Sequence, residues 1–209
     1  MEAPGPETVS SAPPRSWVRL ALVFYAGMLA VALLWRTAWL GQPLLHASPA
    51  AAAAGVRWGA DVGLGLAAGL AGVAASRWLT RRTAAGERLA RALAAALGPL
   101  SARECLVLAL ASGVGEEALF RGAAQPSLGL LGASLLFGAV HFSPRRELWP
   151  WSLLAVFAGL GLGVLFEATG NLVAPIVAHA TLNAINLRLL ARRYGAGAAA
   201  GGCVSPRSR

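Results

Sequence analysis

Residues 102–122, ARECLVLALASGVGEEALFRG, form an apolar stretch of the length that crosses a bilayer, but two adjacent carboxylates and an arginine interrupt it. Roughly 20 helical residues span a hydrocarbon core of about 30 Å. A charged side chain at the centre of such a helix costs at least about 2.5 kcal/mol on insertion scales, so charged groups at this depth usually face a cavity and serve a function. The stretch therefore predicts a membrane helix that carries a functional site.

The composition extends the membrane prediction to the whole chain. Of the 209 residues, 56% are hydrophobic and only 13% are charged, and the mean hydropathy is +0.60. These values lie outside the usual range of soluble domains. We expect an all-α, polytopic membrane helix bundle of about six transmembrane helices around a polar cavity, with spans at residues 20–35, 58–79, 102–122, 128–142, 151–169 and 172–190.

Glycine and alanine are abundant within these expected spans, as in residues 63–69 and 159–163. Small side chains let membrane helices approach closely. We interpret these glycines as packing residues and not as phosphate-binding loops, because no strand precedes them and no lysine follows them.

The basic residues predict the orientation of the chain. All 18 are arginines, the net charge is +9, and most lie in residues 77–103, 145–146 and 188–209. Cytoplasmic loops of membrane proteins carry an excess of arginine and lysine, so we expect both termini in the cytoplasm and a multi-pass protein in the inner (plasma) membrane. The arginines flank spans and belong to no soluble module, so they do not predict nucleic-acid binding.

Four segments are expected along the chain. Residues 1–16 and 195–209 are polar tails that we expect to be disordered. Residues 17–100 hold two membrane helices and a surface amphipathic helix over residues 86–97, where leucines recur every four residues. Residues 101–194 hold the polar motifs and are expected to form the catalytic core.

Three polar motifs occur in order on the expected third, fourth and sixth spans. Each places two side chains four positions apart, and so on one face of a helix: Glu117 with Arg121, Phe137 with His141, and His179 with Asn183. Glu117 and Arg121 are expected to form an ion pair within their helix, whereas Glu116 is rotated from Glu117 by about 100°. One carboxylate is thus held by arginine and the other stays free to react.

These residue types suit peptide hydrolysis. The attacking water must lose a proton to a base, and the oxyanion that forms needs preorganised donors such as an imidazole N–H or an Asn amide. Glu116 with His141 supplies the first requirement, and His179 with Asn183 supplies the second.

The order EExxxR, FxxxH, HxxxN on successive apolar helices resembles the three motifs of the CPBP family, the CAAX prenyl protease and bacteriocin-processing (Abi-like) intramembrane endopeptidases. The resemblance covers roughly residues 101–194. It implies that a peptide bond of a membrane-associated substrate is hydrolysed by activated water. It implies that Glu116 is the general base and that His141 assists it. It implies that Glu117, paired with Arg121, orients the site, and that His179 and Asn183 stabilise the oxyanion. Phe137 would line the cavity wall.

A zinc-dependent version of this hydrolysis is the first alternative, with Glu116, His141 and His179 as the ligands. The sequence lacks HExxH, the pattern in which one helix both holds zinc and supplies the base. The resemblance implies a glutamate-dependent site without a metal, and we favour a site without any cofactor.

Other functions stay open at this point. The pair Glu117–Arg121 serves equally well as a purely structural ion pair, and intramembrane Glu, His and Arg also mark transporters and proton relays. A non-catalytic immunity or scaffold protein is a further alternative. The expected partners are membrane lipids and a peptide or protein with a membrane-anchored segment. The exclusive use of arginine and the wealth of Ala and Gly are typical of a high-GC bacterium, which favours a peptide leader or a C-terminal sorting helix over a prenylated protein as substrate.

Overall fold

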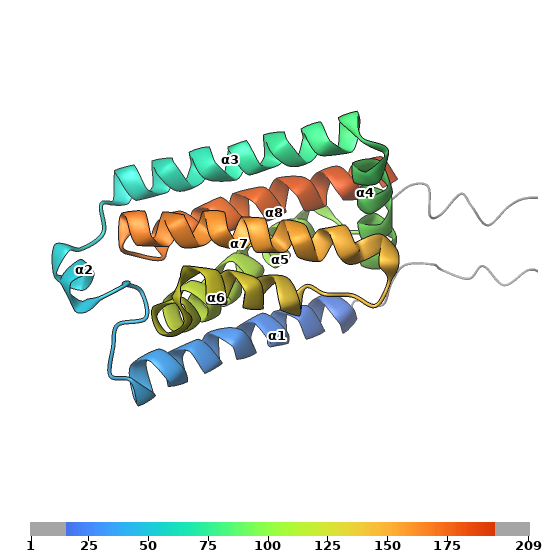
Figure 1. The fold of residues 1–209 in the computed structure, drawn as a ribbon. Coiled ribbons are helices and arrows are strands. Elements are labelled where there is room, and N and C mark those ends of the chain that lie inside the picture. The colour runs from blue at the N-terminus through green and yellow to red at the C-terminus, as the bar shows by residue number, and fades with distance from the viewer. Residues whose placement is uncertain (1–15, 195–209) are drawn as a thin grey trace, which may run out of the picture.

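The computed structural model describes residues 16–194, and these fold into a bundle of long helices (Figure 1). No β-strand occurs in this range; the only bridge is an isolated antiparallel pair between His46 and Asn171. The all-α prediction is confirmed. In chain order the elements are α1 (Ser16–Leu33), η1 (Leu34–Trp39), α2 (Pro49–Ala54), α3 (Trp58–Arg82), α4 (Ala84–Leu97), α5 (Ala102–Glu117), η2 (Ala118–Ala124), α6 (Gln125–Val140), η3 (Arg146–Leu148), α7 (Trp149–Thr169) and α8 (Val173–Tyr194).

Five helical stretches between residues 16 and 194 are long and apolar enough to cross a membrane. Their outer surfaces expose large apolar side chains; Phe24, Leu131 and Phe157, for example, are each about 60% exposed. A soluble protein rarely exposes so much apolar surface in one belt, whereas lipid tails cover it in a membrane. The five stretches are Trp17–Trp39, Trp58–Arg82, Ala102–Val140, Arg146–Thr169 and Val173–Tyr194.

The third stretch explains the difference from the six predicted spans. It contains 39 residues, which as a straight helix would measure about 58 Å. The chain instead turns back at Gly129, whose φ of 72° and ψ of 169° are not helical. The arm before the turn packs on α8 and the arm after it packs on α7, so the two arms correspond to the predicted third and fourth spans.

Close helix contacts confirm the predicted role of several glycines. Along α3, a Cβ on Gly65 would lie 2.6 Å from the carbonyl oxygen of Ala174, and one on Gly69 would lie 2.7 Å from that of Ala178. Any larger residue at either position would therefore push α3 away from α8. This contact leaves α8, which carries the third motif, held between α3 and α5.

The predicted surface helix is present as α4, which lies across one end of the bundle (Figure 1). Leu89 faces inward and is buried, and Glu87 ties the helix to the end of α8 through Tyr194 (2.9 Å) and Arg193 (3.1 Å). We call this the α4 end of the bundle and the opposite one the α2 end. The predicted tails lie outside the described residues, except for Ser16, which begins α1.

Candidate active site

The first motif lies where α5 passes into a π-helix. α5 ends at Glu117, and residues 118–124 continue as η2. Short π-helical segments interrupt α-helices frequently at functional sites. The predicted ion pair within this helix is present, with Arg121 Nε 3.3 Å from Glu117 Oε2, and neither side chain is exposed.

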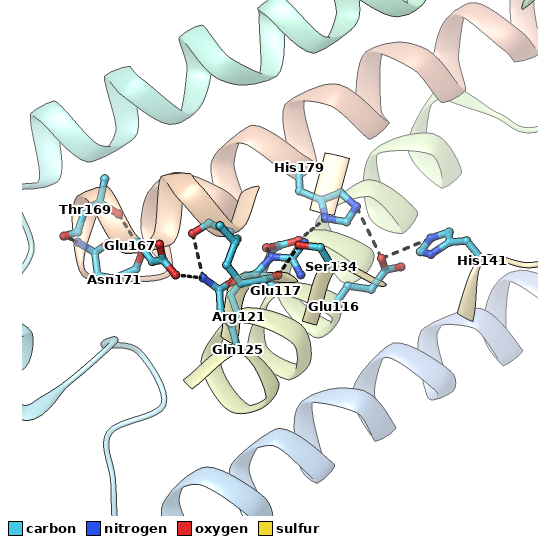
Figure 2. A network of polar contacts seen from close by, with 12 residues as sticks. Glu116, Glu117, Arg121, Gln125, Ser134, His141, Glu167, Thr169, Asn171 and His179 are labelled. Atoms are coloured by element: carbon cyan, nitrogen blue, oxygen red, sulfur yellow. Dashed lines mark hydrogen bonds and ion pairs between the residues drawn. The ribbon is translucent and has the colours of Figure 1, made fainter. Parts of the chain in front are cut away.

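Glu117 has a second partner on α8. Its Oε1 lies 2.7 Å from Nδ1 of His179, which is also buried (Figure 2). Because a carboxylate accepts hydrogen bonds, Nδ1 carries the proton and donates it to Glu117. This contact fixes the orientation of the imidazole and directs its Nε2 away from Glu117.

His141 is oriented in the same manner by a different acceptor. It follows the last residue of α6, and its Nδ1 lies 2.7 Å from the carbonyl oxygen of Phe137. A carbonyl oxygen also only accepts, so Nδ1 of His141 carries a proton. The side chain is 20% exposed, which makes it the most accessible of the motif's titratable groups.

Both imidazoles direct Nε2 at one carboxylate oxygen. Oε2 of Glu116 lies 3.8 Å from Nε2 of His141 and 3.9 Å from Nε2 of His179 (Figure 2). These separations exceed a direct hydrogen bond. The turn at Gly129 makes this convergence possible, because it returns α6 alongside η2 and brings His141 back to Glu116.

Phe137 lies at the centre of this group of side chains. Its ring is 4.8 Å from the guanidinium carbon of Arg121, and the ring centroids of His141 and His179 are 4.5 and 6.1 Å away. The aromatic ring attracts the arginine cation and limits the rotation of both imidazoles. Phe137 is therefore a packing partner of three motif residues at once.

Asn183 lies one turn beyond His179, and its amide donates a hydrogen bond to Ser112 Oγ at 2.9 Å. Ser112 is buried and precedes Glu116 by one turn of α5. The structure thus places Asn183 on the same α5–α8 contact as the other motif residues. Its second amide N–H is chemically suited to an oxyanion.

Two residues at the site were missed in the sequence analysis. Tyr25 of α1 packs against Gly115, and its hydroxyl group is close enough to Glu116 to interact with the carboxylate. Nothing in its local sequence indicates this, because the contact arises from the packing of α1 on α5. Gln125 is buried and donates to the carbonyl oxygen of Gly163 (3.1 Å) and to Glu167 (2.9 Å). It continues the four-residue spacing of Glu117 and Arg121, a signal that was available in the sequence.

Metal binding would require several acidic, histidine or cysteine side chains to converge on one point. Within residues 16–194, no three His, Cys, Asp or Glu side chains are arranged to hold a metal ion.

Comparison with known proteins finds a family match over the part of the chain that carries the motifs. Residues 99–185 match the family of Rce1-like type II CAAX prenyl endopeptidases. This match contains all three motifs and confirms the resemblance predicted from them. An uncharacterised protein of Bacillus subtilis (strain 168), YpbD, is 40% identical over 82 residues, which are 38% of this chain and 42% of that protein. No solved structure matches significantly. The Rce1-like segment, residues 99–185, begins before α5 and ends within α8, so it includes both arms that meet at Glu116.

Proposed function

We propose that this protein is an intramembrane endopeptidase, in which Glu116 activates the water that hydrolyses a peptide bond of a membrane-associated substrate. The observation that carries the proposal is the convergence of His141 Nε2 and His179 Nε2 on Glu116 Oε2, at 3.8 and 3.9 Å. The match of residues 99–185 to an endopeptidase family supports the reaction type.

The reaction begins with proton transfer from water to Glu116. His141, held by the Phe137 carbonyl, presents the lone pair of Nε2 to the same water and orients it. The water oxygen then bonds to the carbonyl carbon of the substrate, and the carbonyl oxygen becomes an oxyanion. Glu116 next returns its proton to the amide nitrogen, the C–N bond breaks, and an acid and an amine leave.

Donors for the oxyanion come from α8. When His179 carries both ring protons, Nδ1–H stays with Glu117 and Nε2–H is available to the oxyanion. The free amide N–H of Asn183 is the second donor of this kind. Preorganised donors of this type contribute about 2.7–4 kcal/mol each to the transition state in other hydrolases. Arg121 and Phe137 act indirectly, because they hold Glu117 and the two imidazoles in place.

The reaction requires no metal in this proposal. A zinc-dependent hydrolysis with Glu116, His141 and His179 as ligands is the alternative, and it predicts a strict dependence on metal. Treatment of the purified protein with a strong chelator separates the two. Unchanged cleavage supports the glutamate mechanism, and loss of cleavage that added zinc restores contradicts it.

We propose the plasma membrane as the location, with the α4 end in the cytoplasm. The arginines of the described residues support this, because those near Arg81, Arg145 and Arg192 all lie at the α4 end, whereas Arg36 and Arg57 lie toward the α2 end and Arg121 is buried in its ion pair. Substrate entry past the partly exposed His141 then occurs from the cytoplasmic leaflet. A reporter active only in the cytoplasm, fused after Tyr194, tests the orientation.

The purified protein in detergent, mixed with membrane-anchored reporter peptides, tests the activity. We expect cleavage by the wild type and by Glu147→Gln, whose carboxylate is exposed in η3, and loss of cleavage in Glu116→Gln and His141→Ala. The reporters should carry either a peptide leader or a C-terminal apolar helix, the two substrate classes that the composition favours. Cleavage that survives both changes would remove the proposal.

A further inference from the structure

A groove of about 480 Å³ lies on the outer surface of α3, toward the α4 end. Its inner part is apolar and includes Leu70 and Val73. Its outer part is lined by three arginines, Arg77, Arg81 and Arg82. One helix face therefore changes from apolar to strongly basic within about 16 Å, the rise of 11 helical residues.

The charges of these arginines are not neutralised by the protein. None of the ion pairs formed among residues 16–194 includes Arg77, Arg81 or Arg82. A nearby acidic residue, Glu87, is already engaged by Arg91 and Arg193. The groove therefore presents positive charge to whatever lies against it.

The position of the groove indicates which molecule lies there. α3 forms a candidate membrane span. Trp78 in the groove wall is 62% exposed, and tryptophan side chains commonly anchor membrane helices at the level of the lipid headgroups. The apolar part then lies at the depth of acyl chains and the arginines at the depth of phosphates. Guanidinium groups bind phosphate oxygens in bidentate fashion.

We propose that this groove binds an anionic phospholipid, with its phosphate between Arg77 and Arg81 and an acyl chain along Leu70 and Val73. The groove is separate from the candidate active site, because its lining residues all belong to α3 and include none of the motif residues. The proposal therefore holds or fails independently of the proposed hydrolysis.

Native mass spectrometry of the full chain in detergent tests the site, with phosphatidylglycerol or phosphatidylcholine titrated in. The variant Arg77→Gln/Arg81→Gln removes the phosphate contacts. The matched control is Arg88→Gln/Arg145→Gln, which removes the same charge from exposed positions at the same end of the bundle. Both changes are on the surface, and thermal unfolding in phosphatidylcholine shows that the variants fold.

We expect a phosphatidylglycerol adduct on the wild type and the control, and an affinity lower by roughly thirtyfold in Arg77→Gln/Arg81→Gln, the effect of two arginines attracting an anionic lipid. Equal binding of the two lipids, or equal loss in both double variants, would overturn the proposal. Displacement of the lipid by an equal concentration of glycerol 3-phosphate would also overturn it, because the acyl chain would then contribute nothing to binding.

Discussion

Nδ1 of His179 lies 2.7 Å from Oε1 of Glu117, although the two residues are 62 positions apart in the chain. Both side chains are buried, and Nε of Arg121 lies 3.3 Å from Oε2, the other carboxylate oxygen of Glu117. Glu117 is thus a bridge between a charged arginine and an imidazole, and not a second free base. This relationship assigns different roles to two neighbouring glutamates.

If Glu117 acts through His179, the effects on kcat of substitutions at the two positions should not be additive. We expect Glu117→Gln and His179→Ala each to lower kcat by roughly 10²-fold, and the double variant to be no slower than the slower single variant. As a control, Glu117→Gln combined with Asn186→Ala should give additive effects, because Asn186 binds Ser76 on α3 instead. Rates of reporter cleavage measure this cycle. Additive losses for Glu117 and His179 would show that they act separately.

Arg121 is expected to contribute to stability as well as to activity. Its replacement by Met leaves Glu117 charged, buried and held by His179 alone, and breaking a buried ion pair costs about 3–5 kcal/mol. We therefore expect a clearly lower unfolding temperature in detergent for Arg121→Met, and no change for Arg88→Met at an exposed position. Equal unfolding temperatures for Arg121→Met and the wild type would mean that this ion pair is not structural.

Tyr25 should affect catalysis although it lies outside the Rce1-like segment. Its hydroxyl group interacts with Glu116, and a hydrogen bond to a charged group is worth about 1.5–3 kcal/mol. We expect Tyr25→Phe to lower kcat by about tenfold or more, with the unfolding temperature unchanged. Tyr194→Phe removes a hydroxyl group that binds Glu87 instead and should leave kcat unchanged. A fully active Tyr25→Phe variant would exclude any role for this hydroxyl.

The attachment of α4 should depend on pH through Glu87. The hydrogen bond from Tyr194 and the charges of Arg193 and Arg91 hold the pKa of the Glu87 carboxyl below its usual value of 4.5. A carboxyl whose pKa is lower in the folded state stabilises that state above the unfolded pKa and loses this effect as the pH falls through the folded pKa. The wild type should therefore unfold at a higher temperature than Glu87→Gln near neutral pH, and the difference should shrink as the pH falls below 4.5 and through the lower pKa of the folded state. A difference that persists in acid would show that the carboxylate charge is not responsible.

Hydropathy and helical spacing were sufficient to predict the helices and the ion pair between Glu117 and Arg121. The spans at residues 58–79 and 151–169 agree with α3 and α7 to within three residues at each end. Charged residues, Arg57 and Arg81, border the first span, whereas Pro150 and Gly170 mark the start and end of the second. The turn at Gly129 was not predicted as a feature of the backbone. The break between the predicted spans 102–122 and 128–142 coincides with Gln125, Pro126 and Ser127, but the helix continues over these residues and the chain turns at Gly129, where φ is positive.

Contacts between distant elements were the part that the sequence alone did not reveal. Spacing within a helix placed His179 and Asn183 on one face, but it did not indicate that His179 binds Glu117 and that Asn183 binds Ser112. Asp61 is buried and accepts a hydrogen bond from Asn171, which joins α3 to the turn before α8. Such contacts depend on which helices become neighbours, and neighbours follow from packing of the whole bundle.

Hydrolysis in ¹⁸O-labelled water tests the central role of Glu116 most directly. The purified protein is incubated with a membrane-anchored reporter peptide, and the label in the new carboxyl group of the product is followed by mass spectrometry. We predict incorporation of one labelled oxygen per cleavage by the wild type, and a rate about 10² to 10⁴-fold lower in Glu116→Gln. Incorporation at the wild-type rate by Glu116→Gln would contradict the account.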